Sequence, residues 1–272
     1  MVVLRSDLEG VGKSTVGSLM TRIFGPHALE VSDTDLLTGQ FNESLAEKTF
    51  ILVEEAPFPG AHTTANRLKA MITARHHQIN PKGRKPYSVP NTSHIMLATN
   101  EKWAVPAGAA ARRFLVIDVS RKMDRSYFRR LYTEIDNGGA EAFLRALLKC
   151  DLGRFDPQDV PVTAALVHQQ RMSADDITKW VTDAVASNVL APGLSSHGFG
   201  QRVSAAELYD AYLAWAARQR LQHPRSYVAF AGELNSLGMS RMKSSISTWD
   251  VPTAAQLLRN ADQRAGIQKV TA

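Results

Sequence analysis

The chain has 272 residues, of which 44% are hydrophobic and 21% charged, a composition typical of one large or two modest folded domains. No apolar run approaches the roughly 20 residues of a membrane-spanning helix, and the N-terminus lacks the pattern of a secretory signal. We therefore expect a cytoplasmic protein without a membrane partner. The single cysteine, Cys150, excludes an intramolecular disulfide and a metal cluster made of cysteines alone.

Positive charge is concentrated in one part of the chain. Lys and Arg number 32 against 26 Asp and Glu, a surplus of six. Residues 56–100 contain no acid but hold six basic residues: Arg67, Lys69, Arg75, Lys82, Arg84 and Lys85. Such a patch indicates a polyanionic partner, of which nucleic acid is the commonest.

Short apolar runs alternate with helical periodicity through the first 150 residues. The runs predict strands at 2–4, 50–53, 95–98 and 114–117, and the intervening patterns predict helices at 13–24, 64–74, 125–135 and 139–149. In the third of these helices Phe128, Leu131, Tyr132 and Ile135 form one apolar face. The alternation predicts an α/β domain, a parallel sheet with helices on both faces.

A phosphate-binding loop is predicted between the first strand and the first helix. The residues from Gly10 to Thr15 read Gly-Val-Gly-Lys-Ser-Thr, which places backbone N–H groups and a helix N-terminus around a phosphate chain. We expect Gly10, Val11, Gly12, Lys13, Ser14 and Thr15 to bind ATP. Lys13 would reach the β and γ oxygens, and the Ser14 hydroxyl would ligate Mg²⁺. Asp7 stands where the full pattern has a glycine.

Polar residues that follow two later strands complete the predicted site. We expect Glu54 to hold Mg²⁺ and Glu55 to polarise the attacking water as general base. Asn100 follows the third strand and would orient that water. Arg112 and Arg113 precede the fourth strand; a guanidinium at a subunit edge can stabilise charge at a neighbouring site, and the alternative is a solvated or phosphate-contacting basic pair.

The rest of the chain is predicted to hold a second, smaller domain. We expect an ATPase domain over 1–150, a helical connector and linker over 151–200, and a small winged-helix-like domain over 201–272. The last segment, 202–272, has nine Lys and Arg against five Asp and Glu. Arg225, Arg241 and Lys243 are its candidate phosphate contacts, whereas its aromatic residues are expected to form its core: Tyr209, Tyr212, Trp215, Tyr227 and Phe230.

The order of these features resembles the superfamily 3 helicases of the AAA+ class, a group of P-loop NTPases. The similarity is greatest to the helicase part of phage and poxvirus-type primase-helicases, and it covers roughly residues 3–151. It implies a hexameric ring that hydrolyses ATP at subunit interfaces and unwinds single-stranded or forked DNA in phage or prophage replication. It also assigns Arg113, and less surely Arg112, as the arginine finger, and Asn100 as the sensor.

In that family the segment before the sensor strand carries a hairpin that projects into the ring channel. The resemblance places it here at 75–89, with residues 81–85 as its tip. His76, His77, Lys82, Arg84 and Lys85 would then follow backbone phosphates without reading sequence. Because the sequence starts at the first strand, we expect the oligomerisation collar and a primase or polymerase domain to come from an upstream gene or a missing N-terminal region.

Two other functions fit part of the pattern. A nucleotide-gated DNA clamp or loader remnant would bind DNA without unwinding it, and Asp7 together with the abrupt start of the chain favours this alternative. A P-loop kinase of small molecules would share the phosphate loop. The paired acids and the basic segment of 56–100 argue against the kinase.

Overall fold

The sheet of the N-terminal half contains five parallel strands. In the computed structural model their order is β2-β3-β6-β1-β7. The strands are β1 (Val2–Arg5), β2 (Ala28–Val31), β3 (Phe50–Glu54), β6 (His94–Thr99) and β7 (Leu115–Asp118). The apolar runs of the three central strands β3, β6 and β1 are buried, as in a parallel sheet covered by other elements: Val3, Ile51, Leu52, Val53 and Leu97 are fully inaccessible. Ile117 of the edge strand β7 is 40% exposed. The predicted parallel sheet is confirmed.

The structure describes residues 1–32, 37, 39–55, 62–108, 111–191, 198–242 and 247–271, with only the backbone for 62–67. Contacts divide the chain into two compact units. The first comprises residues 1–107, 111–169 and 270–272, and the second comprises 108–110 and 170–269. The sequence-based domain boundaries at 150 and 200 stay a prediction, and most of the predicted linker, 192–197, lies outside the described residues.

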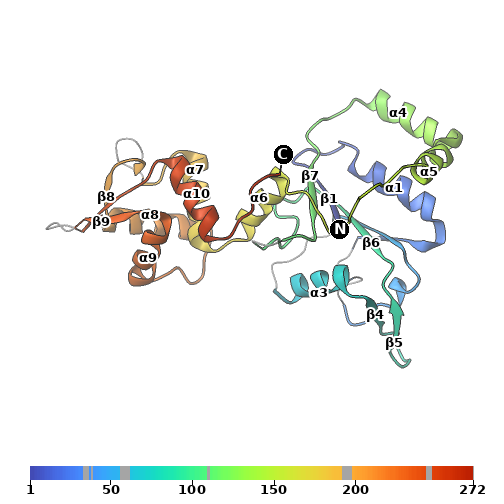
Figure 1. Ribbon diagram of the computed structural model, residues 1–272, viewed down its shortest axis with the longest axis horizontal. Helices are drawn as coiled ribbons and strands as arrows, with labels where there is room; N and C mark the ends of the chain where they lie inside the picture. Colours follow the sequence, from blue (N-terminus) through green and yellow to red (C-terminus); the bar gives the residue numbers. More distant parts are fainter. Residues whose placement is uncertain are drawn as a thin grey trace. The chain divides into compact units, whose positions relative to one another are not determined.

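Helix α1 (Lys13–Phe24) packs across β2, β3 and β6 of the first unit. The approach is close at Gly17, where an added Cβ would lie 2.5 Å from Cδ1 of the buried Leu52. Helix α4 (Arg125–Glu134) continues through the π-turn η3 (Ile135–Gly139) into α5 (Ala140–Leu148). Helix α5 lies against α1, where Arg22 pairs with Asp136 at 2.9 Å (Figure 1).

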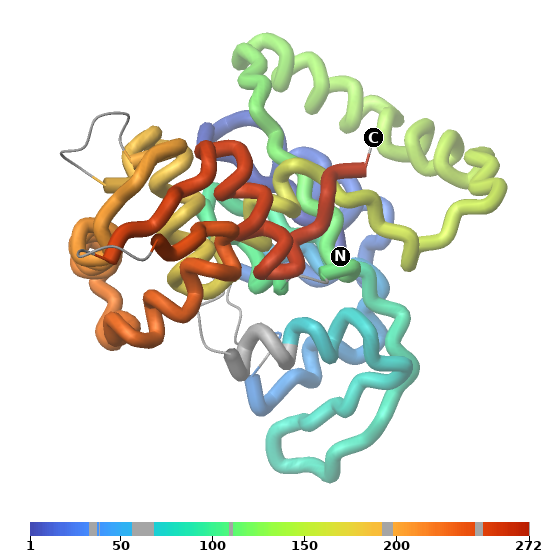
Figure 2. The backbone as a smooth tube through the Cα atoms, turned by 60° about the vertical axis from the view of Figure 1, so that its left-hand side comes forward, coloured from blue at the N-terminus to red at the C-terminus, as the bar shows by residue number. Residues whose placement is uncertain are grey.

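A two-stranded antiparallel hairpin extends from the first unit. It consists of β4 (His76–Ile79) and β5 (Tyr87–Pro90), and both views show it reaching beyond the parallel sheet (Figures 1 and 2). Helix α3 (His62–Thr73) precedes it, and the Asn91 amide donates to the carbonyls of Met71 and Ala74 at 2.9 Å each, which ties the hairpin to the helix. The predicted hairpin is confirmed. Two short 3-10 turns complete this unit: η1 (Gly25–His27) and η2 (Glu43–Leu45).

The second unit combines helices with a three-stranded antiparallel sheet of order β8-β10-β9. Helix α6 (Ala164–Ser173) spans the boundary between the units. The other elements are α7 (Asp176–Ser187), β8 (Arg202–Ser204), α8 (Ala205–Arg218), α9 (Tyr227–Leu234), η5 (Asn235–Leu237), β9 (Ser240–Met242), β10 (Thr248–Asp250) and α10 (Ala254–Arg264). A capping box formed by Ser204 and Glu207 opens α8.

Aromatic side chains form the core of the second unit, as predicted. Tyr212 and Phe230 are fully buried and stack with ring centroids 5.0 Å apart, and Trp215 is 5% exposed. Tyr227 is the exception at 43% exposure, because it is the first residue of α9 and contacts Tyr209 only edge to face. The helices and small sheet suit a winged-helix module, which stays a prediction.

Candidate phosphate-binding site

The predicted site residues converge at one edge of the parallel sheet. Arg5 pairs in register with Thr99, and Glu54 with Ala98, so β1, β3 and β6 end at the same level. The loop after β1, the acids after β3 and Asn100 after β6 are therefore adjacent. Ligands of open α/β sheets bind at this carboxyl edge. A cavity of about 310 Å³ lies here, lined by Glu9, Gly10, Val11, Gly12, Lys13, Ser14, Thr15, Glu55, Ala98, Asn100, Phe128 and Tyr132.

The loop from Gly10 to Thr15 has the backbone that a phosphate cradle needs. Gly10 and Gly12 have φ of 70° and 92°, and Gly12 is the N-cap of α1 with no side-chain hydrogen bond to the helix. The first N–H groups of α1 therefore face the cavity without a capping side chain. Ser14 is exposed and lines the same cavity. The arrangement suits an anion at the start of α1.

The Lys13 ammonium donates to Oδ1 of Asn100 at 2.6 Å. Lys13 is only 8% exposed, and this burial lowers its pKa below the ordinary lysine value, against the opposing negative charges of Glu55 and Glu9. A buried cation with one amide partner retains donors for an anionic ligand. The structure thus joins Lys13 and Asn100, which are 87 residues apart in sequence.

The two acids after β3 occupy different environments. Glu55 lines the cavity and has φ of 54°, an uncommon backbone conformation for a residue other than glycine. Glu54 is part-buried, and within the described part of the chain its Oε1 is inaccessible and has no hydrogen-bond partner. A buried carboxylate oxygen without a partner is costly unless a ligand satisfies it. Both side chains are compatible with the predicted roles, which stay untested.

Four residues of the cavity wall were not predicted as site residues: Glu9, Ala98, Phe128 and Tyr132. Phe128 and Tyr132 lie one turn apart on α4, and both line the cavity. The Tyr132 hydroxyl is 2.9 Å from Oγ1 of Thr15, and Cε1 of Phe128 lies 2.8 Å from where a Cβ on Gly12 would be. Helical periodicity identified their apolar face, but it does not show which part of the fold that face covers.

Asp7, the departure from the glycine pattern, is turned to Arg5. Arg5 is 6% exposed and donates from Nη1 and Nη2 to the two Asp7 oxygens at 2.8 and 3.4 Å, and from Nε to Asp118 at 2.7 Å. The guanidinium of Arg5 lowers the pKa of Asp7 below its ordinary value. Asp7 is not among the described residues that line the cavity. Its charge is therefore neutralised by the buried arginine of β1.

The predicted finger arginines lie at the amino ends of the strands, opposite the carboxyl ends where the phosphate loop lies. Arg113 precedes β7, and its carbonyl accepts from the Met1 nitrogen at 3.1 Å, at the amino end of β1. At about 3.3 Å per residue, the four residues of β1 separate this edge from the phosphate loop by roughly 10 Å. Arg112 is exposed and Arg113 part-buried, and neither lines the cavity of its own chain.

The predicted DNA contacts of the hairpin separate into two groups. Lys82, Arg84 and Lys85 are exposed at the tip, and His76 is exposed on β4. His77 is 9% exposed, its Nε2 lies 3.1 Å from the Ser93 hydroxyl, and burial lowers its pKa. The His77 ring is buried rather than exposed to a DNA backbone, so we withdraw His77 from the DNA-binding set. Neighbouring residues on a strand point to opposite faces, and β4 buries this one.

In the second unit, Arg241 is exposed on β9 and bonds the Ser247 hydroxyl at 3.2 Å, whereas Lys243 lies outside the described residues. Arg225 is not available for phosphate. It pairs with Asp175, Asp176 and Glu233 at 3.2, 2.8 and 3.0 Å. Burial alone would raise the pKa of Asp175, but hydrogen bonds from Arg264 and Thr178 outweigh it and lower the pKa to about 2. These charges stabilise the unit internally.

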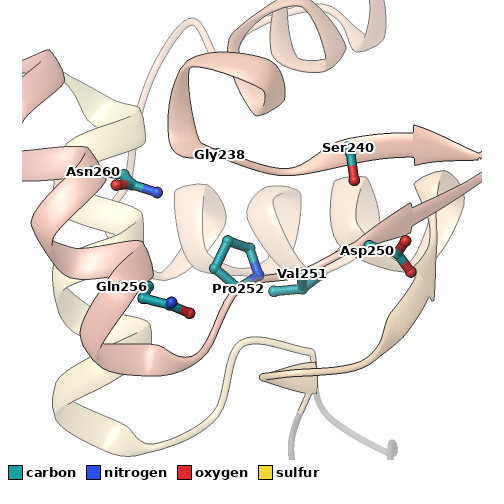
Figure 3. A pocket seen from close by; sticks show the side chains of 7 residues that line it. All are labelled: Gly238, Ser240, Asp250, Val251, Pro252, Gln256 and Asn260. Atoms are coloured by element: carbon teal, nitrogen blue, oxygen red, sulfur yellow. The ribbon is translucent and has the colours of Figure 1, made fainter.

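A second cavity, of about 370 Å³, lies in the second unit and is unrelated to the predicted site (Figure 3). Its described lining contains one charged residue, Asp250, and the amides of Gln256 and Asn260 from α10. It offers no cation to an anionic ligand among those residues, so we assign it no role.

Comparisons with known proteins support this description of the fold. A family of unknown function, DUF5906, matches residues 4–113, which include the phosphate loop, the acids and the arginine pair. A curated relative, the DNA primase-polymerase of Nitratiruptor phage NrS-1, is 28% identical over 184 residues, which are 64% of this chain and 25% of the relative. The chain thus matches only about a quarter of that protein's length.

Solved structures of the NrS-1 C-terminal region share the fold. One apo structure has a TM-score of 0.59 at 20% identity and covers 92% of this chain and 67% of the other. A second structure, the A form of the apo region, has a TM-score of 0.59 at 19% identity and covers 92% of this chain and 66% of the other.

Within the described residues, no helix is long and apolar enough to span a membrane.

Proposed function

We propose that this chain is a nucleotide-hydrolysing motor of phage DNA replication, of the superfamily 3 helicase type. The observation that carries the proposal is the convergence of Lys13, Asn100 and Glu55 on one cavity at the carboxyl edge of a parallel sheet. Similarity to a phage DNA primase-polymerase, 28% identical over 184 residues, supports the replication role.

In this proposal the loop binds the phosphates of ATP. N–H groups of the loop and of the first turn of α1 surround the phosphate chain, and Lys13 exchanges its bond to Asn100 for the β and γ oxygens. Asn100, released from Lys13, then orients the attacking water, and Glu55 accepts its proton. Hydrolysis rather than transfer follows, since the acid faces a cavity open to water.

The oxygens at the site fit Mg²⁺. The exposed Ser14 hydroxyl and the partnerless Oε1 of Glu54 are hard ligands of the kind this ion prefers. Among the described residues no cluster of three His, Cys, Asp or Glu side chains is placed to hold a metal. Mg²⁺ usually takes one or two protein ligands together with substrate phosphates, and it supplies charge neutralisation there.

The arginine pair supports a shared site. Because Arg112 and Arg113 lie at the sheet edge away from the phosphate loop of their own chain, they suit a finger that enters the site of a neighbouring subunit, in a hexameric ring. The exposed Lys82, Arg84 and Lys85 at the hairpin tip are proposed to follow the backbone of single-stranded DNA in the ring channel. Arg241 is proposed as a further phosphate contact.

A DNA clamp that binds without unwinding remains the second candidate, since the same loop and hairpin serve it. The pairing of Asp7 with Arg5 removes one argument for it, because that carboxylate does not repel phosphate in the cavity. The kinase alternative lacks support from the hairpin, whose exposed cations have no role in binding a small acceptor.

The decisive experiment measures ATP hydrolysis with and without single-stranded DNA, followed by strand displacement on a forked duplex. We expect hydrolysis that DNA stimulates, and Lys13→Ala to reduce turnover about a hundredfold or more, because it removes the charge that stabilises the transferred phosphoryl group. Ser18→Ala, on the exposed face of α1, is the matched control. Hydrolysis indifferent to DNA contradicts the motor, and hydrolysis without strand displacement favours the clamp.

A further inference from the structure

Helix α4 supplies an aromatic wall to the nucleotide site. We propose that Phe128 and Tyr132 bind the base of the nucleotide, with the Phe128 ring as its stacking surface. This inference rests on the proposed function, because it names the part of the ligand that α4 contacts. The ligand it predicts is a nucleoside triphosphate rather than an inorganic polyphosphate.

The charges in the cavity fix the direction of the ligand. Lys13, Asn100 and Glu55 lie together, and the Lys13 cation there marks the terminal-phosphate end. Phe128 and Tyr132 contact the loop elsewhere, at Gly12 and Thr15. Both side chains are aromatic rings, and Tyr132 adds one hydroxyl. The α4 wall therefore suits the uncharged, nucleoside end of the molecule.

The contacts and the exposure of the two rings suit the binding of a base. Phe128 is part-buried, and Tyr127 meets it edge to face at 5.3 Å and 83°, which restrains the ring. Tyr132 is 48% exposed, and its hydroxyl is held by Thr15 of the loop. Aromatic rings that line a polar cavity offer stacking surface that a flat heterocycle can cover. Nucleic-acid bases in general stack on such rings.

Close packing on Gly12 links the wall to the phosphate loop. The Phe128 ring occupies the space that any larger residue at position 12 would need, since its Cε1 is 2.8 Å from the built Cβ. A base stacked on Phe128 is therefore adjacent to the loop that holds its phosphates. Binding energy from the base then adds to that from Lys13.

The test compares two ligands that differ in the nucleoside. Binding of the ATP analogue AMP-PNP and of inorganic tripolyphosphate is measured by calorimetry with Mg²⁺, for the wild type, Phe128→Ala and Phe128→Trp. We expect Phe128→Ala to weaken AMP-PNP about tenfold and tripolyphosphate less than about threefold, and Phe128→Trp to restore AMP-PNP binding. Phe143→Ala on α5, an exposed phenylalanine outside the cavity, is the control and should change neither.

Other outcomes overturn the proposal in recognisable ways. Unchanged AMP-PNP affinity in Phe128→Ala excludes stacking on this ring. An equal loss of both ligands shows that Phe128 only supports the loop at Gly12. If the wild type binds neither ligand, the proposed function fails as well, whereas the first two results leave it intact. Thermal unfolding of each variant, followed by circular dichroism, establishes that it is folded.

Discussion

At the scale of single residues, the site has a lysine whose ammonium lies in the cavity and an aspartate whose carboxylate is paired outside it. Lys13 donates to Asn100, and Asp7 pairs with Arg5. Asp7 therefore stays out of the cavity, whereas Glu9, another carboxylate after β1, lines the cavity and acts on Lys13 together with Glu55. Arg5 is buried between two acids, Asp7 and Asp118, so its own charge is neutralised without reaching the cavity.

The Asp7 arrangement predicts tolerance of glycine, the residue that the phosphate-loop pattern has at this position. Asp7→Gly should change the KM for ATP less than about twofold, because the carboxylate it removes is not in the cavity. It should cost less than about 1 kcal/mol of unfolding free energy, since Asp7 is 65% exposed and Arg5 keeps Asp118. Steady-state kinetics and urea unfolding measure the two effects. A tenfold fall in KM would show that Asp7 repels the nucleotide.

The sequence predicted which residues form the site better than it predicted their contacts and burial. Lys13, Glu55 and Asn100 were expected from their places after strands, and parallel strands bring such positions to one edge. The Arg5–Asp7 pair has no sequence signal that separates it from solvated charges. His77 could be recognised as buried only once β4 paired with β5 and fixed which face turns inward.

At the scale of elements, the strands with continuous apolar runs were predictable from the sequence, whereas the edge strand β2 was not. β2 contains Glu30, which is exposed because the strand lies at the end of the sheet, so its apolar run is interrupted. For α4 the apolar face was predicted, but the face covers the phosphate loop in part rather than only the core. Periodicity reports which face is apolar, whereas the partner of that face depends on the tertiary fold.

The hairpin formed by β4 and β5 carries the prediction at this scale. Changing Lys82, Arg84 and Lys85 together to Ala should weaken single-stranded DNA binding equally for different sequences, because exposed tip cations contact phosphates. The slope of log affinity against log salt should fall by about 2, because each phosphate contact on a single strand contributes roughly 0.7. Fluorescence anisotropy with labelled oligonucleotides measures both quantities.

A matched control lies in the same unit. Arg121, Lys122 and Arg125 are exposed cations near the start of α4 and outside the hairpin, and their replacement by Ala removes the same charge. If this control weakens binding as much as the hairpin variant, the contact is a general effect of net charge. A loss confined to one DNA sequence would contradict phosphate tracking.

At the scale of the whole molecule, the two units differ in how charge is used. The first unit exposes cations at the hairpin tip, where Arg84 lies 3.5 Å from Glu43, and holds Lys13 in the phosphate loop. The second unit pairs Arg225 and Arg264 with Asp175 and Glu233. Total charge therefore overstates what the second unit offers to DNA. Its surplus of basic residues was visible in the sequence, but the internal pairing of Arg225 was not.

A shared site between subunits makes a sharp prediction for mixtures. Lys13→Ala and Arg113→Ala should each abolish ATP turnover, the second by about a thousandfold with nucleotide binding retained. In a mixed ring, some interfaces combine the intact Lys13 of one variant with the intact Arg113 of the other. Mixing the two inactive proteins should therefore restore part of the activity, with a maximum near equal proportions.

The mixing experiment has its own internal control. A double variant that carries both substitutions in one chain, mixed with either single variant, provides no interface with both residues intact and should stay inactive. Arg112→Ala in place of Arg113→Ala decides which arginine is the finger. Absence of complementation between folded, ring-forming single variants would show that Arg113 does not act on a neighbour's nucleotide, and the position of the pair at the far edge of the sheet would then need another explanation.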